Sequence, residues 1–277
     1  MNRYLSLFRF GNGVMGIIGV AVGALLAAGT GMTDYAVWIV LGCLVAVIFI
    51  AGGNALNDYV DRDIDREAHP ERPIPSGSMS PDTAKSLGIG MLVLAAALSL
   101  AYGLTGEGGG WTSTAIVVLC TVLMFSYETF LKQRGLIGNI DIAFMTAMVF
   151  LLGGSVTGRP LDNAVFACMA FLVSVGREIS KDIEDMESDK GRRTLPMSIG
   201  ADRAAAIAAV FFVLGPVLSL YPVLFQDIGP CYYLVFVADA IFLYCAYIVR
   251  ADAHKAQKLA KIAMFAALIA FVLDVII

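Results

Sequence analysis

The sequence is poor in charged residues and in histidine. Only 15% of its 277 residues are Asp, Glu, Lys or Arg, and it has two histidines, His69 and His254. Soluble domains carry about 25% charged residues, so the composition excludes an ordinary water-soluble globule. With only two histidines in the chain, we do not expect a histidine zinc site or a histidine-based catalytic triad.

The cysteines are few and unpaired in sequence. Cys43, Cys120, Cys168, Cys231 and Cys245 lie singly in apolar segments, without a CxxC motif or a neighbouring histidine. We interpret them as small core residues and not as metal ligands or disulfides. Basic charge is not in excess either, because 19 Lys and Arg stand against 23 Asp and Glu. The net charge of -4 does not indicate a basic surface for binding nucleic acid.

The chain is rich in apolar residues. Hydrophobic residues make up 58% of it, and apolar runs of about 17 to 25 residues are typical of transmembrane helices. We therefore expect an all-α polytopic membrane bundle, a single domain over residues 1–277, with nine transmembrane helices and little soluble structure. The predicted spans are 13–28, 35–57, 83–104, 112–131, 138–157, 163–183, 202–225, 232–249 and 257–277.

The basic residues lie on one side of this predicted bundle. All 19 except Arg159 fall before the first span or around the loops that follow even-numbered spans. Lys and Arg accumulate in the cytoplasmic loops of membrane proteins. We therefore predict that the N-terminus and these loops face the cytoplasm, and nearly all acidic residues lie on the same side.

The first acidic motif, residues 54–77, reads NALNDYVDRDIDREAHPERPIPSG. Asn57, Asp61 and Asp65 are spaced four apart, so on an α-helix they drift by about 40° per step and line one face. Asp58 and Asp63 lie off this stripe, although Asp58 is close enough to Asp61 to assist it. Oxygen ligands of this kind suit hard cations such as Mg²⁺.

The second acidic motif, residues 177–200, begins REISKDIEDMESD. Asp182, Asp185 and Asp189 are three and four apart and share one helical face. An arginine and a proline-containing turn follow in both motifs, at 71–77 and 193–200, which indicates a pseudo-repeat. A solvated acidic surface is the alternative for either motif alone. Because close carboxylates repel one another, two such stripes that face each other predict a shared multivalent cation.

These motifs resemble the two aspartate-rich motifs of the UbiA-type intramembrane prenyltransferase superfamily. NDYVDRDID with RPIPSG, and KDIEDMESD with RTLP, carry the resemblance, which extends over nearly the whole chain. Within the superfamily, the second motif and the short chain are most similar to the archaeal digeranylgeranylglyceryl phosphate synthases. The resemblance implies nine helices around a cytoplasm-facing pocket. It also implies Mg²⁺-dependent transfer of a geranylgeranyl group from its diphosphate to geranylgeranylglyceryl phosphate, which forms the second ether bond of archaeal lipids.

The resemblance further implies roles for individual residues. One Mg²⁺ ion would be held by Asn57, Asp61 and Asp65, and a second by Asp182, Asp185 and Asp189, with Asp58 as a further candidate. The diphosphate would meet Lys132, which follows Tyr127 in FSYETFLK, together with Arg72 and Arg193. The remaining substrate-binding candidates are Arg9 and Asn12 in RFGN, Lys181 for a phosphate on the acceptor, and Asn139. Arg9 also fits a positive-inside anchor.

Other functions stay open on the sequence alone. The acceptor could be an aromatic quinone precursor or a tetrapyrrole. A cation transporter is a different class, but transport pathways place carboxylates near the middle of the bilayer and not at one face. Asp239, inside the predicted span 232–249, is interpreted as an interhelical hydrogen-bond partner. The expected partners are a prenyl diphosphate, a lipid-phosphate acceptor and the bilayer, without nucleic acid or an obligate protein partner.

Overall fold

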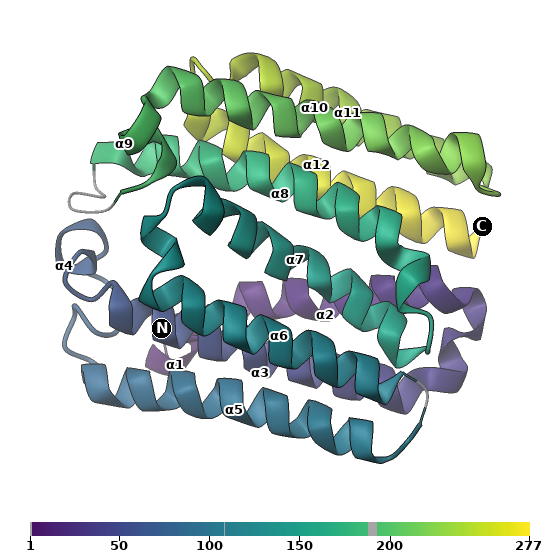
Figure 1. Cartoon of the computed structure of the whole chain (residues 1–277), viewed down its shortest axis with the longest axis horizontal. Helices are drawn as coiled ribbons and strands as arrows, with labels where there is room; N and C mark the ends of the chain where they lie inside the picture. Colours follow the sequence, from purple (N-terminus) through teal and green to yellow (C-terminus); the bar gives the residue numbers. More distant parts are fainter. Residues whose placement is uncertain (1, 108, 188–192) are drawn as a thin grey trace.

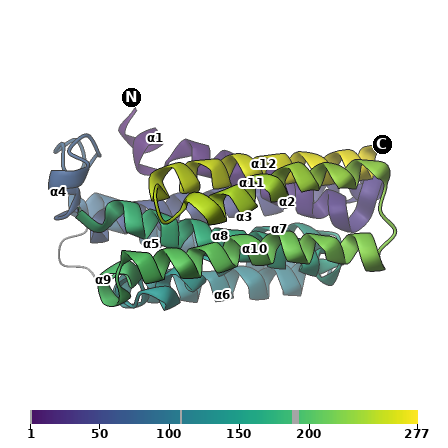
Figure 2. The ribbon, with the colours of Figure 1, turned by 90° about the horizontal axis from the view of Figure 1, so that it is seen from above.

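The structure is a computed structural model that describes residues 2–107, 109–187 and 193–277, and every regular element in these ranges is helical. The long helices run along one common direction, and the view from above shows them stacked in layers (Figures 1 and 2). They are α2 (Phe10–Ala28), α3 (Ala36–Val60), α5 (Pro81–Leu104), α6 (Gly110–Thr129), α7 (Leu136–Val156), α8 (Ala164–Glu184), α10 (Ala201–Phe225), α11 (Val235–Ile248) and α12 (Ala253–Ile276). The short ones are α1 (Arg3–Leu7), α4 (Asp65–Ala68) and α9 (Leu195–Ile199).

Eight segments of the described chain are long and apolar enough to cross a membrane. The first of them, Phe10–Val60, contains both α2 and α3, which the 3-10 turn η1 (Gly29–Tyr35) separates. Large apolar side chains such as Val37, Val122 and Phe225 are exposed, as expected for a surface that contacts lipid. The protein is therefore a multi-pass membrane protein, and a helix lies at each predicted span.

Small residues bring the backbones of α2 and α7 into direct contact. A Cβ atom on Gly23 would lie 2.5 Å from the carbonyl oxygen of Phe150, and one on Gly153 would lie 2.3 Å from that of Val20. The amide of Asn163 donates hydrogen bonds to the carbonyl oxygens of Gly23 and Phe150, at 2.7 and 2.8 Å. Close approach through glycine is typical of helices that pack within lipid. It fixes α2, whose first turn reaches the functional site, against α7.

Gly153→Val is expected to destabilise the bundle, because the obstructing atom is a backbone carbonyl that no rotamer change removes. Overpacking costs about 1–3 kcal/mol, which corresponds to a fall of roughly 2–5 °C in Tm for a chain of this size. Thermal unfolding in detergent measures the change. Gly90→Val on α5 is the matched control, since a Cβ there meets nothing within 4 Å. An equal fall in both variants would contradict the packing argument.

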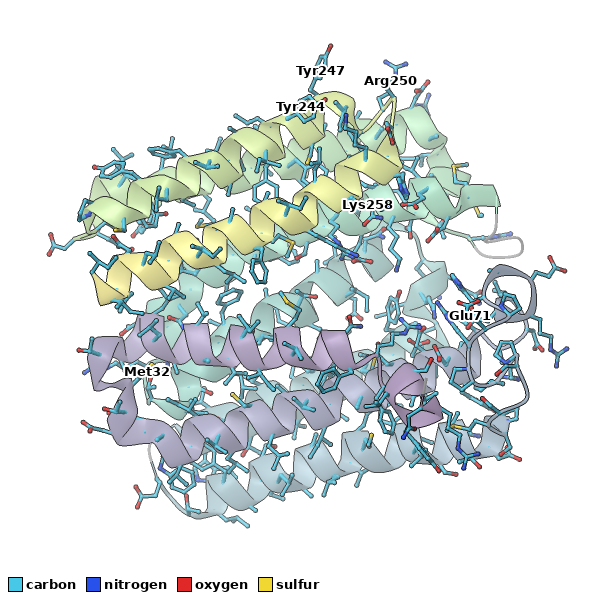
Figure 3. The ribbon with its side chains drawn as sticks, turned by 180° about the vertical axis from the view of Figure 1, so that it is seen from behind. Met32, Glu71, Tyr244, Tyr247, Arg250 and Lys258 are labelled. Carbon is cyan, nitrogen blue, oxygen red and sulfur yellow. The ribbon has the colours of Figure 1, made fainter. Side chains whose placement is uncertain are left out.

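The two acidic motifs meet at one end of the bundle. In Figure 1 the short helices α4 and α9, each of which lies within one of the two acidic motifs, are at the same end of the molecule. Figure 3 places Glu71, Arg250 and Lys258 toward that end and Met32 toward the other. The N-terminus lies near the charged end and the C-terminus at the opposite end (Figures 1 and 2). Segments far apart in sequence are thus gathered where the charged loops are.

Both motifs are followed by similar local structure, although the pseudo-repeat stays a prediction. α3 leads through α4 to α5, which packs against α3, and α8 leads through α9 to α10, which packs against α8. Glycines with a left-handed backbone, Gly77 at φ 74° and Gly200 at φ 88°, end the two connections. Ser80 then caps α5 by accepting a hydrogen bond from the Thr83 amide at 3.1 Å.

Candidate active site

The first acidic motif runs past the end of its helix. α3 ends at Val60, and residues 61–64 form a turn before α4, whereas the four-residue spacing predicts a continuous α-helix. Backbone hydrogen bonds between residues four apart nevertheless continue through this turn. The Asp61 amide donates to the Asn57 carbonyl at 2.9 Å, and the Asp65 amide donates to the Asp61 carbonyl at 2.8 Å. Asn57, Asp61 and Asp65 therefore all line one cavity.

Two basic side chains neutralise this motif, Arg72 from its own second half and Lys132 from a later segment. Lys132 Nζ donates to Asp61 Oδ2 at 2.7 Å, and Arg72 Nη1 donates to Asp65 Oδ2 at 2.6 Å. Both carboxylates are buried, and a buried charge is stable only when it is paired. The carboxylates thus hold two cations at the polar end of the cavity.

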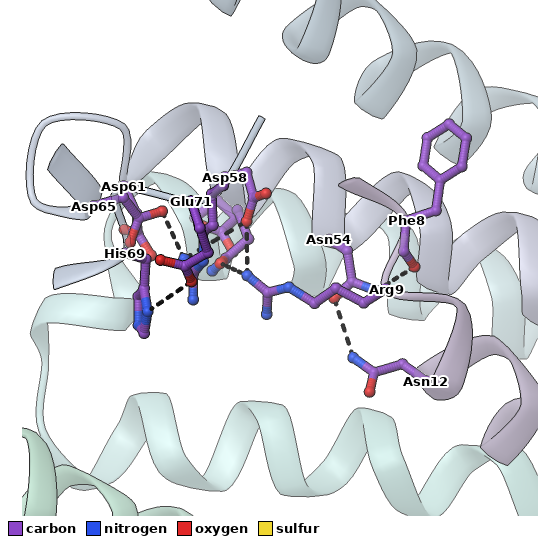
Figure 4. Close-up of polar contacts among 12 residues, drawn as sticks. Phe8, Arg9, Asn12, Asn54, Asp58, Asp61, Asp65, His69 and Glu71 are labelled. Atoms are coloured by element: carbon purple, nitrogen blue, oxygen red, sulfur yellow. Dashed lines mark hydrogen bonds and ion pairs between the residues drawn. The ribbon is translucent and has the colours of Figure 1, made fainter. Parts of the chain in front are cut away.

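Asp58 lies behind the cavity wall and not on it, contrary to the prediction of a binding role. Its side chain is 2% exposed, and its Oδ1 lies 2.7 Å from Arg9 Nη2 and 3.7 Å from Arg72 Nη1. Two arginines thus cover the carboxylate, and Figure 4 shows the Arg9 guanidinium directed at it. Arg9 has a left-handed backbone with φ 46°, a strained conformation that persists only where contacts fix it. Asp58 therefore positions Arg9 and Arg72.

Asn12 joins the first turn of α2 to α3. Its Nδ2 donates to Asn54 Oδ1 at 3.4 Å, and Asn54 Nδ2 donates to the Phe8 carbonyl at 3.0 Å (Figure 4). Arg9 and Asn12 both line the cavity, as does Asn54.

Glu128 is a buried residue of the site that the sequence analysis missed. Its Oε1 accepts a hydrogen bond from Asn57 Nδ2 at 3.0 Å, and its Oε2 lies 3.2 Å from Lys132 Nζ. It thereby ties α3 to α6 and to the 3-10 turn η2 (Leu131–Gln133). The Lys132 ammonium also lies 5.6 Å from the centroid of the Tyr127 ring. The i, i+4 spacing of Glu128 and Lys132 was the available signal.

The second acidic motif reaches the cavity from α8. Asp182 Oδ2 accepts a hydrogen bond from Asn139 Nδ2 of α7 at 2.9 Å. α8 ends at Glu184, and Asp185 begins the 3-10 turn η4 (Asp185–Glu187). Asp182 and Asp185 both line the cavity. Asp189, the third predicted ligand of this motif, lies outside the described residues.

The two motifs share one cavity of about 950 Å³. Besides the carboxylates already described, its polar wall includes the predicted residues Arg9, Asn12, Asn57, Arg72, Tyr127, Lys132, Asn139 and Lys181. Arg193 is exposed and does not line it, so the structure does not bring this predicted diphosphate ligand to the site. Much of the remaining wall is apolar, with Met15, Phe49, Met145, Val149, Met169 and Phe265 among its residues.

Asp239 belongs to the apolar part of the cavity wall. Its Oδ2 accepts a hydrogen bond of 2.6 Å from the hydroxyl of Ser219, which lies on α10. The predicted interhelical hydrogen bond is thus confirmed. Because α10 and α11 pack side by side, this bond satisfies the carboxylate where lipid offers no partner.

The oxygen donors of the cavity fit Mg²⁺ only when a substrate supplies further ligands. Among the described residues, no three His, Cys, Asp or Glu side chains are close enough to hold a metal by themselves. Mg²⁺ usually takes one or two protein carboxylates and completes its shell with water and phosphate. Asn139 Oδ1 is buried on the wall without a hydrogen-bond partner in the described chain, which leaves an oxygen available.

Comparison with known proteins agrees with this geometry. The model of the UbiA prenyltransferase family matches residues 17–269. The digeranylgeranylglyceryl phosphate synthase of Methanosphaera stadtmanae is 36% identical over 281 residues, 98% of this chain and 98% of the relative. The enzyme of that name from Thermococcus kodakarensis is 38% identical over 265 residues, 93% of this chain and 92% of the relative.

Solved structures show the same fold. A structure described as that of digeranylgeranylglyceryl phosphate synthase in membranes has a TM-score of 0.81 at 30% identity, over 99% of this chain and 98% of the other. A UbiA homolog from Archaeoglobus fulgidus, bound to GPP and Mg²⁺, has a TM-score of 0.76 at 18% identity over 100% of both chains. Both acidic motifs lie within the matched residues 17–269. The chain therefore belongs to the UbiA prenyltransferase family.

Proposed function

We propose that the protein transfers a geranylgeranyl group from geranylgeranyl diphosphate to geranylgeranylglyceryl phosphate, forming the second ether bond of an archaeal lipid. The observation that carries the proposal is the single cavity on which Asp61, Asp65, Asp182 and Asp185 all lie. Relatives named digeranylgeranylglyceryl phosphate synthase that align with nearly the whole chain support this choice of acceptor.

The reaction exchanges one carbon–oxygen bond for another. The bond between prenyl C1 and the diphosphate oxygen breaks, and the glycerol hydroxyl oxygen bonds to C1 as its proton is released. Negative charge grows on the departing diphosphate. Arg72 and Lys132, which Asp65 and Asp61 hold at the polar end, stabilise this charge through charge-assisted hydrogen bonds. Mg²⁺, when bound, neutralises a further part of it.

Two Mg²⁺ ions are part of this proposal. Asn57, Asp61 and Asp65 hold one, and the second motif, with Asp182, Asp185 and Asp189, holds the other. In support, the Archaeoglobus fulgidus homolog was solved with GPP and Mg²⁺ and with DMAPP and Mg²⁺. The apolar cavity wall is suited to a prenyl chain, which needs surroundings without water.

The proposal also includes nine membrane crossings with the polar end at the cytoplasmic face. Phe10–Val60 has 51 residues, and as one helix it would be about 75 Å long, while the apolar core of a bilayer is about 30 Å thick. Its two helices, α2 and α3, thus favour two crossings. The termini at opposite ends of the bundle favour an odd number of crossings (Figures 1 and 2). The basic loops support the orientation.

An assay of the purified protein tests this function. With radiolabelled geranylgeranyl diphosphate and Mg²⁺, geranylgeranylglyceryl phosphate is expected to give a labelled lipid product, and an aromatic acid or a tetrapyrrole is expected to give none. Chelation with EDTA should stop turnover, and added Mg²⁺ should restore it, because the carboxylates need the metal to receive a diphosphate. Product with an aromatic acid alone would overturn the proposal.

A further inference from the structure

We propose that Arg177, Lys181 and Lys261 form a second anion subsite in the cavity and that it holds the phosphate of the acceptor lipid. The inference rests on the proposed function, since it assigns a place to that acceptor. All three side chains line the cavity. Arg177 and Lys181 are on α8, and Lys261 is on α12.

The cavity-facing side of α8 divides into a basic and an acidic edge. Arg177 and Lys181 are four residues apart and therefore about 40° apart around the helix axis, whereas Asp182 lies about 140° from Arg177. The acidic edge faces α7, where Asn139 donates to Asp182. α8 also packs against α12, and Figure 1 shows it between α7 and α12. The basic edge thus meets Lys261, away from the contact with α7.

Glu178 contacts two of the three cations at this basic edge. Arg177 Nη1 donates to Glu178 Oε1 at 2.5 Å, and Lys181 Nζ lies 3.8 Å from Glu178 Oε2. Lys261 is within electrostatic range of all three of these residues. Arg177 Nε is buried and has no hydrogen-bond partner in the described chain. Since like charges repel, the cluster is stabilised by a further anion.

Glu184 does not supply that anion. Its charge acts on Lys261, but both of its oxygens already have partners on α12. His254 Nδ1 contacts Oε1, and Gln257 Nε2 donates to Oε2 at 3.1 Å. Arg177, Lys181 and Lys261 carry one positive charge more than Glu178 and Glu184 can neutralise, so positive charge remains at the wall of the cavity.

The surface that continues from the cluster fits a lipid and not a free phosphate. Met264, Phe265 and Leu268 also line the cavity. They follow Lys261 at three, four and seven residues, so they share its face of α12. A headgroup at Lys261 would lay its chain along this apolar stripe. The donor diphosphate has other cations, Arg72 and Lys132, beside the first motif.

Steady-state kinetics of Lys261→Gln tests the subsite. KM for geranylgeranylglyceryl phosphate is expected to rise at least tenfold, while KM for geranylgeranyl diphosphate stays within twofold. With geranylgeranylglycerol, which lacks the phosphate, wild type and variant should be equally active. Lys181→Gln should behave in the same way and serves if the first variant does not fold. Lys258→Gln is the matched control, because Lys258 is exposed on α12 and does not line the cavity.

The outcomes separate this inference from the proposed function. An equal rise in both KM values would mean that the cluster does not bind the acceptor selectively. Unchanged KM values would mean that it binds neither substrate. Either result overturns the subsite. A wild-type protein that does not prenylate geranylgeranylglyceryl phosphate would overturn the function. In that case, the increase in Tm caused by geranylgeranylglyceryl phosphate alone tests whether the subsite binds this lipid. Stabilisation that Lys261→Gln abolishes supports it, and equal stabilisation, or none in the wild type, overturns it.

Discussion

Asp61→Asn is expected to lower kcat for prenyl transfer by about 10³-fold. The carboxylate is a proposed Mg²⁺ ligand, and it also holds the Lys132 ammonium at 2.7 Å. Asparagine keeps the size of the side chain but removes the charge that both interactions need. Single-turnover measurement with radiolabelled geranylgeranyl diphosphate and excess acceptor reports the chemical step directly.

Asp63→Asn is the control from the same motif. The Asp63 side chain is 66% exposed, is absent from the cavity wall, and lies 3.5 Å from Arg66 at the surface. Exposed ion pairs contribute about 0–1 kcal/mol, so this variant should keep the wild-type rate and Tm. If Asp61→Asn retained most of the wild-type rate, the metal assignment would be wrong.

The features that could be predicted from the sequence are those that depend on local spacing. A long apolar run indicates a membrane helix wherever its neighbours lie, so a helix occurs at every predicted span. The spacing of Asn57, Asp61 and Asp65 survives even the end of α3, because turn hydrogen bonds repeat the four-residue step. Asp182 and Asp185 reach the same cavity for a similar reason.

Features that depend on tertiary contacts could not be predicted. Asp58 is of a residue type that could bind a metal, but Arg9 from another segment and Arg72 from further along the motif cover it. Glu128 is four residues before Lys132 in sequence. Its place in the site becomes clear only from the hydrogen bond that Asn57 donates to it. Lys261 looked like one of several basic residues near a loop, because nothing in the spacing says that α12 packs against α8. A pattern within one helix does not specify its neighbour.

Lys132→Met is expected to lower kcat by roughly 10²–10³-fold, because it removes a fixed positive charge from the departing diphosphate. Methionine keeps most of the alkyl chain, whereas Lys132→Arg keeps the charge and should restore part of the rate. Arg134→Met is the control, since Arg134 follows the same turn, is exposed and does not line the cavity. kcat and Tm are measured on the same preparations.

Loss of Lys132 also affects folding, so stability and catalysis must be separated. The ammonium is paired with both Asp61 and Glu128, and removing one partner of a buried ion pair costs about 3–5 kcal/mol. Adding Glu128→Gln to Lys132→Met removes one of the two carboxylates that the single variant leaves without the ammonium. The Tm of the double variant should therefore be higher than that of Lys132→Met. If Lys132 acts on the diphosphate, kcat stays low in this double variant. Activity that returned together with Tm would assign Lys132 a structural role and contradict the proposed catalytic one.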